Sequence, residues 1–127
     1  MAEKIRYELE YTFKTSPKML YYRLATASGL SEWFADDVKV QKNIMTFSWK
    51  GSEQAAEILE RKKNISAKYR WVDNDEDNFF EFKLNKDELT GDLALIITDF
   101  ADDEEEKTDD IELWDTQIQE LKRILGL

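Results

Sequence analysis

The sequence predicts an α+β fold in which a curved antiparallel sheet of about seven strands wraps around one long C-terminal helix. Hydrophobic residues recur at every second position in residues 5–13 and again, between short polar breaks, in residues 36–100. Residues 109–125 have helical spacing instead. Because a sheet with one wet face must cover its other face, we expect the final helix to lie on the sheet.

The N-terminal residues predict one strand followed by a helix. The strand alternates without a break, and its hydrophobic face consists of Ile5, Tyr7, Leu9, Tyr11 and Phe13. Ser16 can cap the helix that follows, and Pro17 suits its first position. We expect this helix to run for about three turns and to stop at Gly29. One or two short helices therefore follow the first strand.

A second short helical turn is expected to open at Ser31 and to carry Trp33 and Phe34. Two adjacent rings in an acidic stretch have two interpretations. They can pin the short helices to the open end of the sheet, or they can gate a ligand site. Exposing both rings would leave apolar area in water, so the first interpretation is favoured, with one ring buried and the other partly exposed.

Hydrophobic residues alternate again in residues 36–100, which predicts about six further strands joined as an antiparallel meander. The breaks between them are polar and of turn length. The expected strands are Val38 to Val40, Met45 to Trp49, Glu53 to Arg61, Ile65 to Trp71, Phe80 to Leu84, and Leu89 to Phe100.

The last helix is expected between Asp109 and Leu125, where Gly126 ends it. Its apolar face comprises Ile111, Trp114, Ile118, Leu121 and Leu125. At 127 residues the chain has the size of one domain, which we assign to residues 1–127.

Composition excludes several classes of function. The chain has no cysteine and no histidine, which removes disulfides, thiol nucleophiles, Ser-His-Asp catalysis and the usual zinc or haem ligands. The net charge of −10 argues against nucleic acid, which proteins bind with Lys and Arg. No apolar run approaches the length of a membrane span, and no secretory h-region opens the chain, so a cytoplasmic location is expected.

The remaining polar residues indicate neither catalysis nor a metal site. Glu57 and Glu81 could face inward, but no spacing forces two carboxylates together, so an enzyme is the minority interpretation and no catalytic residue is assigned. Asp73, Asp75 and Asp77 match the start of a calcium loop, but the required glycine and final glutamate are absent. We expect no metal and no cofactor.

Two stretches of the sequence resemble the START-like (SRPBCC) superfamily, in the branch related to the Hsp90 co-chaperone Aha1. The first comprises Leu24–Thr26 and Gly29–Val38, which are similar to the end of the family's first helix and its Trp-containing turn. The second is Thr98–Asp102 with Trp114 in the last helix. The turn lacks the family's proline and has Ala27-Ser28 instead. The resemblance covers the whole chain and implies a helix-grip fold.

That fold often encloses a hydrophobic ligand between sheet and helix. We therefore predict a small hydrophobic ligand or lipid, with a candidate cavity lined by Trp33, Phe34, Phe47, Trp49, Tyr69, Trp71, Phe80, Phe82, Trp114 and Ile118. The alternative for each ring is a place in a filled core.

A second function remains open, in which an Aha1-like module docks a basic protein partner. From residue 99 to 112 there are nine acidic residues and one lysine. The same carboxylates also suit the start of a helix, where they interact with its dipole. Both a monomer and a homodimer are compatible with the sequence.

Overall fold

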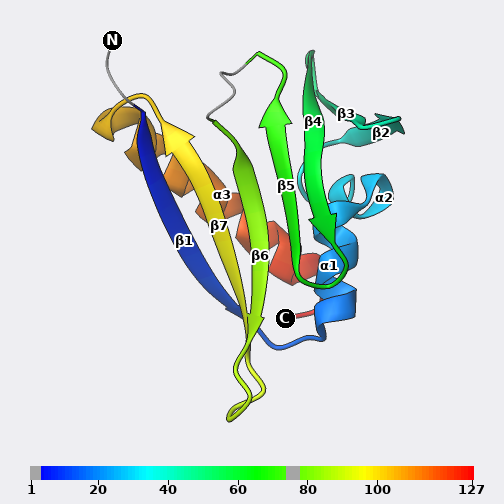
Figure 1. Cartoon of the computed structure of the whole chain (residues 1–127), viewed down its shortest axis with the longest axis vertical. Coiled ribbons are helices and arrows are strands. Elements are labelled where there is room, and N and C mark those ends of the chain that lie inside the picture. The colour runs from blue at the N-terminus through cyan, green and yellow to red at the C-terminus, as the bar shows by residue number, and fades with distance from the viewer. Residues whose placement is uncertain (1–3, 74–77) are drawn as a thin grey trace.

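The computed structural model describes residues 4–73 and 78–127 and confirms the predicted α+β architecture (Figure 1). A seven-stranded antiparallel sheet carries two short helices after its first strand and one long C-terminal helix. The elements are β1 (Ile5–Phe13), α1 (Pro17–Ala25), α2 (Ala27–Leu30), β2 (Asp37–Gln41), β3 (Ile44–Trp49), β4 (Ser52–Lys62), β5 (Ser66–Trp71), β6 (Phe80–Lys86), β7 (Leu93–Ala101) and α3 (Glu104–Ile124).

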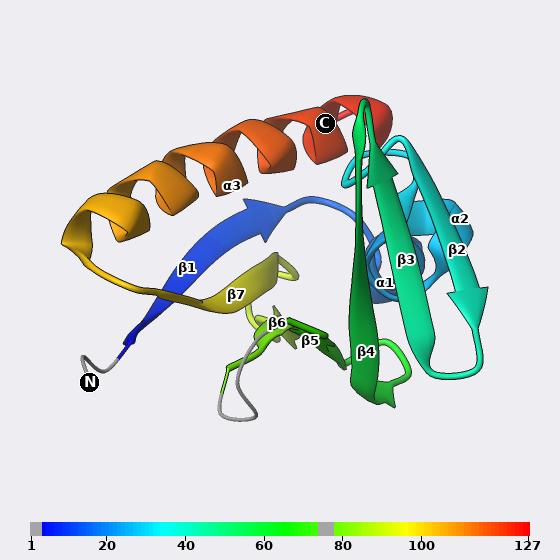
Figure 2. The ribbon, with the colours of Figure 1, turned by 90° about the horizontal axis from the view of Figure 1, so that it is seen from above.

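The strand order is β1-β7-β6-β5-β4-β3-β2, so only the first strand departs from a meander. It pairs with the last strand, and Tyr7 lies directly opposite Asp99. The sheet curves, and α3 lies across its concave side, as Figure 2 shows. No described helix combines the length and the apolar character needed to cross a membrane.

The core fills the space between the concave face and α3. The helix contributes Trp114, Ile118 and Leu121, all buried and spaced at helical intervals. The strands contribute alternate residues, such as Leu95 and Ile97 on β7 with their buried neighbours. The inward-facing side chains of the strands and the apolar face of α3 thus form one apolar layer.

Two element boundaries differ from the sequence prediction. Helix α3 begins at Glu104 rather than Asp109, because the Asp103 carboxylate accepts a hydrogen bond from the backbone N–H of Glu106 at 2.8 Å and caps the helix. Strand β7 begins at Leu93 rather than Leu89. The Asp87 carboxylate accepts a hydrogen bond from the Leu89 N–H at 2.8 Å, which holds a turn there.

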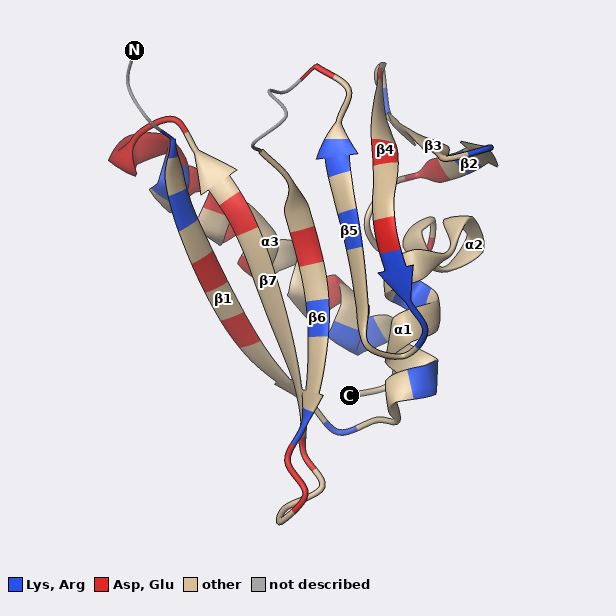
Figure 3. Ribbon diagram, viewed as in Figure 1, with Lys and Arg blue, Asp and Glu red and all other residues tan. Residues whose placement is uncertain are grey.

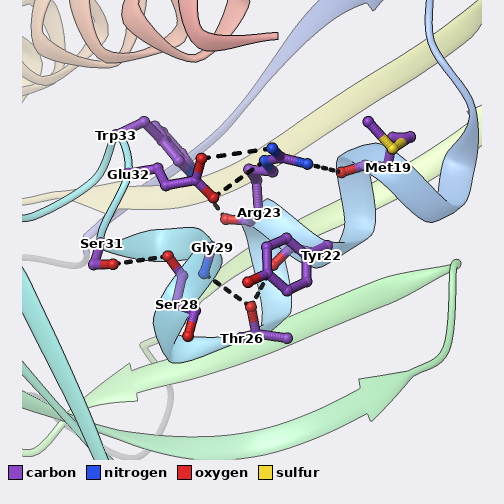
Figure 4. Close-up of polar contacts among 9 residues, drawn as sticks. All are labelled: Met19, Tyr22, Arg23, Thr26, Ser28, Gly29, Ser31, Glu32 and Trp33. Carbon is purple, nitrogen blue, oxygen red and sulfur yellow. Dashed lines mark hydrogen bonds and ion pairs between the residues drawn. The ribbon is translucent and has the colours of Figure 1, made fainter.

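The junction of the two short helices is the other difference. Helix α1 ends at Ala25, and α2 opens after Thr26, so Gly29 lies inside α2 and Ser31 follows it. The Thr26 hydroxyl donates to the Tyr22 carbonyl at 2.6 Å and accepts from the Gly29 N–H at 2.9 Å (Figure 4). The prediction that Gly29 stops the first helix is therefore wrong: its role is to let α2 approach α1.

The close approach at Gly29 makes a testable prediction. A Cβ atom there would overlap the Tyr22 carbonyl oxygen and lie 2.7 Å from the Cα of Arg23. Helix propensity alone would favour Gly29→Ala by about 1 kcal/mol. We expect the overlap to outweigh it and the variant to lose about 1–3 kcal/mol in urea unfolding. Ser28→Ala, on the exposed side of α2, is the control. An unchanged midpoint for Gly29→Ala would contradict this packing.

Candidate ligand-binding pocket

A pocket of about 420 Å³ lies between the concave face of the sheet and α3. Its lining comes from elements far apart in the sequence, from the start of β1 to the middle of α3. The lining contains a group of aromatic residues that contact one another, a group of polar residues, and in addition Phe100 and Leu113. The aromatic group is Phe34, Trp49, Trp71, Phe80 and Trp114.

The aromatic residues form one continuous wall. The ring centroids of Trp71 and Phe80 are 5.0 Å apart, and those of Trp49 and Trp71 are 6.4 Å apart. Phe34 lies 6.0 Å from Trp114, which connects the wall to α3. The Trp49 indole N–H donates to the Phe34 backbone carbonyl at 2.9 Å, which fixes the Trp49 ring in place.

Asp99 lies at the polar end of the pocket. Its carboxylate accepts hydrogen bonds from the Trp114 indole N–H at 3.0 Å, the Tyr7 hydroxyl at 3.3 Å and the Phe100 backbone N–H at 2.8 Å. Burial raises the pKa of Asp99, and its effect exceeds that of the three donors, which act in the opposite direction. Burial and the nearby Asp99 charge also raise the pKa of Tyr7.

Further carboxylates from α3 and the preceding loop complete the polar group. Asp110, Asp102 and Glu106 all line the pocket together with Asp99. Partial burial, followed by repulsion from Asp99 and Glu106, raises the pKa of Asp110 to about 6. The one lysine of the lining, Lys4, forms an ion pair with Asp102 at 3.6 Å.

The predicted site residues divide between pocket and core. Phe34, Trp49, Trp71, Phe80 and Trp114 line the pocket. Trp33 borders a neighbouring hollow of about 440 Å³ beside Phe34, and its indole N–H donates to the Arg23 carbonyl at 2.7 Å (Figure 4). The others are enclosed in the core and line neither space: Phe47, Tyr69, Phe82 and Ile118.

Trp33 and Tyr69 hold the short helices on the sheet. Trp33 is 7% exposed, and its ring lies 6.0 Å from that of Phe82 on β6. The Tyr69 hydroxyl on β5 donates to the Leu24 carbonyl at 2.7 Å, which ties α1 to the sheet. Each of these polar atoms satisfies a backbone carbonyl inside the fold.

The polar group of the pocket was not among the predicted site residues, although its signal is in the sequence. Asp99 occupies the inward register of its strand, in line with the buried Leu95 and Ile97. Asp110 is four residues before the buried Trp114, so both lie on one face of α3. Asp99 and Asp110 could have been identified in the sequence as carboxylates at positions where the strand alternation or the helical spacing calls for a hydrophobic residue.

The other carboxylates considered in the sequence, Glu57 and Glu81, do not lie together in a catalytic site. Glu57 forms an ion pair with Arg70 at 3.1 Å, and the two are opposite each other on β4 and β5. Glu81 pairs with Lys68 and Thr98 in the sheet registers, away from Glu57. Among the described residues no acidic group is arranged to hold a metal ion. The stretch that matches only the start of a calcium loop includes residues 74–77, which lie outside the described part of the chain.

A family model described as a START-like superfamily domain matches residues 1–127. The chain belongs to the START-like superfamily. None of the curated proteins compared with it matches. Membership agrees with the resemblance found in the sequence and with a sheet that grips its last helix.

Solved structures extend the similarity of this START-like domain. A solution NMR structure of BfR322 from Bacteroides fragilis is 34% identical, with a TM-score of 0.70, over 98% of this chain and 93% of that one. The Aha1 dimer from Colwellia psychrerythraea is 17% identical, with a TM-score of 0.77, over 93% of each chain. MLL2253 from Mesorhizobium loti is 16% identical, with a TM-score of 0.75, over 96% of this chain and 97% of that one. The last two show the fold alone.

The raised pKa of Asp110 predicts how stability depends on pH. With a folded pKa of about 6, the folded state binds a proton more tightly than the unfolded chain, where an Asp titrates at about 3.9. The resulting stabilisation is present below about pH 4 and is lost as the pH rises through about 6. Asp110→Asn should therefore raise the free energy of unfolding at about pH 8 and have little effect at about pH 4.

Urea unfolding at both pH values measures this difference, which solvent screening makes smaller than the full pKa shift would give. Glu112→Gln, an exposed change of the same charge on α3, is the control. Equal effects of the two substitutions at both pH values would show that Asp110 is not held in an unfavourable environment.

Proposed function

We propose that this START-like domain binds a small hydrophobic ligand between its sheet and α3. The observation that carries the proposal is the pocket of about 420 Å³ with its aromatic wall. This volume is within the range of small-molecule sites. Such sites are mostly apolar, whereas this lining has as many polar and charged residues as apolar ones, so the aromatic wall supplies the apolar contact. The fold supports the proposal, since START-like domains commonly bind hydrophobic ligands.

The geometry of the wall favours binding without rearrangement. Trp49 and Phe34 are connected by a hydrogen bond, and Trp114 is held by Asp99. Gln117 from α3 donates to the Phe34 carbonyl at 3.4 Å on the same side of the pocket. A ligand that contacts these rings therefore meets side chains already ordered, which lowers the entropy cost of binding.

A second candidate function is docking of a basic protein partner through the acidic end of the domain. The observation in its favour is the exposed group of carboxylates at residues 102–106, at the start of α3 (Figure 3). A partner held by these charges would dissociate as salt is added. The similar Colwellia structure is a dimer, so a homodimer as well as a monomer fits this fold.

The ligand proposal predicts the effect of shortening one wall residue. Trp71→Leu removes a ring that lies 5.0 Å from Phe80 and borders the pocket, so a bound apolar molecule loses contact area. We expect its affinity to fall about tenfold. Phenylbutanol is a suitable probe, because it combines a ring, a short chain and one polar atom. Titration calorimetry gives the affinity, and thermal unfolding gives the accompanying rise in Tm.

Trp33→Phe is the control, because Trp33 lies outside this pocket and the substitution keeps a ring in the core. Its affinity for the probe should match that of the unchanged protein. If Trp33→Phe lost binding while Trp71→Leu kept it, the ligand would occupy the neighbouring hollow instead.

A further inference from the structure

The polar end of the pocket has carboxylates without matching cations. Among the residues that the structure describes, Asp99, Glu106 and Asp110 form no ion pair with any Lys or Arg. Lys4 is near, but its ammonium pairs with Asp102. The pocket therefore combines an aromatic wall with an excess of negative charge.

Capping of α3 explains only part of this arrangement. Residues 104–106 form the first turn of the helix, where carboxylates interact favourably with the helix dipole. Asp99 is on strand β7, and Asp110 lies beyond the first turn, where the dipole has little effect. Both are partly buried, and burial raises the pKa of each. Interaction with the helix dipole therefore accounts for neither of them, although Asp99 also anchors Trp114 of α3.

We infer that the ligand of this pocket is an organic cation, an ammonium group joined to an apolar body. This inference rests on the proposed function and specifies the ligand's charge. The apolar body would lie against Trp71, Trp49 and Phe80. The ammonium would lie between the Trp114 ring and the carboxylates of Glu106 and Asp110.

Two independent features of the pocket favour a cation. The face of an indole or phenyl ring attracts an ammonium group electrostatically, most strongly for Trp, and the attraction grows when water is excluded. The carboxylates add direct charge attraction, which is stronger at the partly buried Asp99 and Asp110 than at the exposed Glu106. An anionic ligand would meet repulsion from Asp99, Glu106 and Asp110 with only Lys4 in its favour. The same pocket therefore selects against fatty acids.

The test compares three probes that each join a phenyl ring and a short alkyl chain to one polar group: phenylbutylamine, phenylbutanol and phenylbutyrate. Calorimetry at about pH 7.5, where the amine is protonated and the acid ionised, should give an affinity for the amine about tenfold above that for the alcohol. Phenylbutyrate should bind most weakly. Equal binding of amine and alcohol would overturn the inference and leave the proposed function intact, whereas no binding of any probe would contradict both.

Matched variants locate the effect in the pocket. Asp110→Asn combined with Glu106→Gln should abolish the preference for the amine, measured as the ratio of the amine and alcohol affinities in the same variant. Glu112→Gln lies on α3 outside the pocket lining and should keep the preference. Because the chain carries a net charge of −10, a cation is attracted to every surface. Equal losses in all variants would assign the preference to that general attraction and overturn the inference.

The dependence on pH gives an independent readout. The groups that face Asp110 are Asp99 on β7, Tyr7 on β1, and Asp102, Glu106 and Asp109 around the start of α3, with Lys4 near the rim. As the pH falls through about 6, Asp110 becomes neutral. A quaternary probe, phenylbutyltrimethylammonium, keeps its charge, so its affinity should fall between about pH 8 and pH 5. A constant affinity over this range would count against the inference.

Discussion

The ring of Phe34 contacts aromatic side chains from β3, β6 and α3, and these contacts connect elements that are not neighbours in the sheet. Its centroid is 5.1 Å from that of Phe47, 6.1 Å from that of Phe80 and 6.0 Å from that of Trp114. Aromatic pairs at such distances add stability beyond the area that they bury. The turn after α2 is therefore part of the core, and its backbone carbonyl also accepts the Trp49 hydrogen bond that orders the pocket wall.

Much of this fold could be predicted because the hydrophobic periods are long and unbroken. The strict alternation in β1 and the helical spacing in α3 gave the correct element types and their order. The boundaries were less accurate, since single side-chain hydrogen bonds determine them. Asp103 moves the start of α3, and Thr26 divides one expected helix into two. A polar side chain can hydrogen-bond to any of several nearby backbone groups. Which of them it caps, and therefore where the helix begins, depends on the folded structure.

The candidate site was predicted less fully than the fold. The sequence identified rings that could face the sheet's concave side, but not which would remain at a cavity wall. Phe80 borders the pocket whereas Phe82, two residues later on the same face, is enclosed. Both residues lie on β6, so the alternation of that strand does not distinguish them. A charged group at an inward position, such as Asp99, contradicts the local pattern, and such conflicts are expected at functional sites.

The pairing of β1 with β7 has a consequence for how the domain is made. Ile5 pairs with Ala101, so β1 has no partner until the residues of β7 have been synthesised. Closing so large a loop has a high entropy cost, and folds rich in such distant pairings form slowly. Until then the apolar side of β1, including Leu9 and Phe13, is open to other chains. The interval between synthesis and closure is when this protein is most exposed to aggregation and to chaperones.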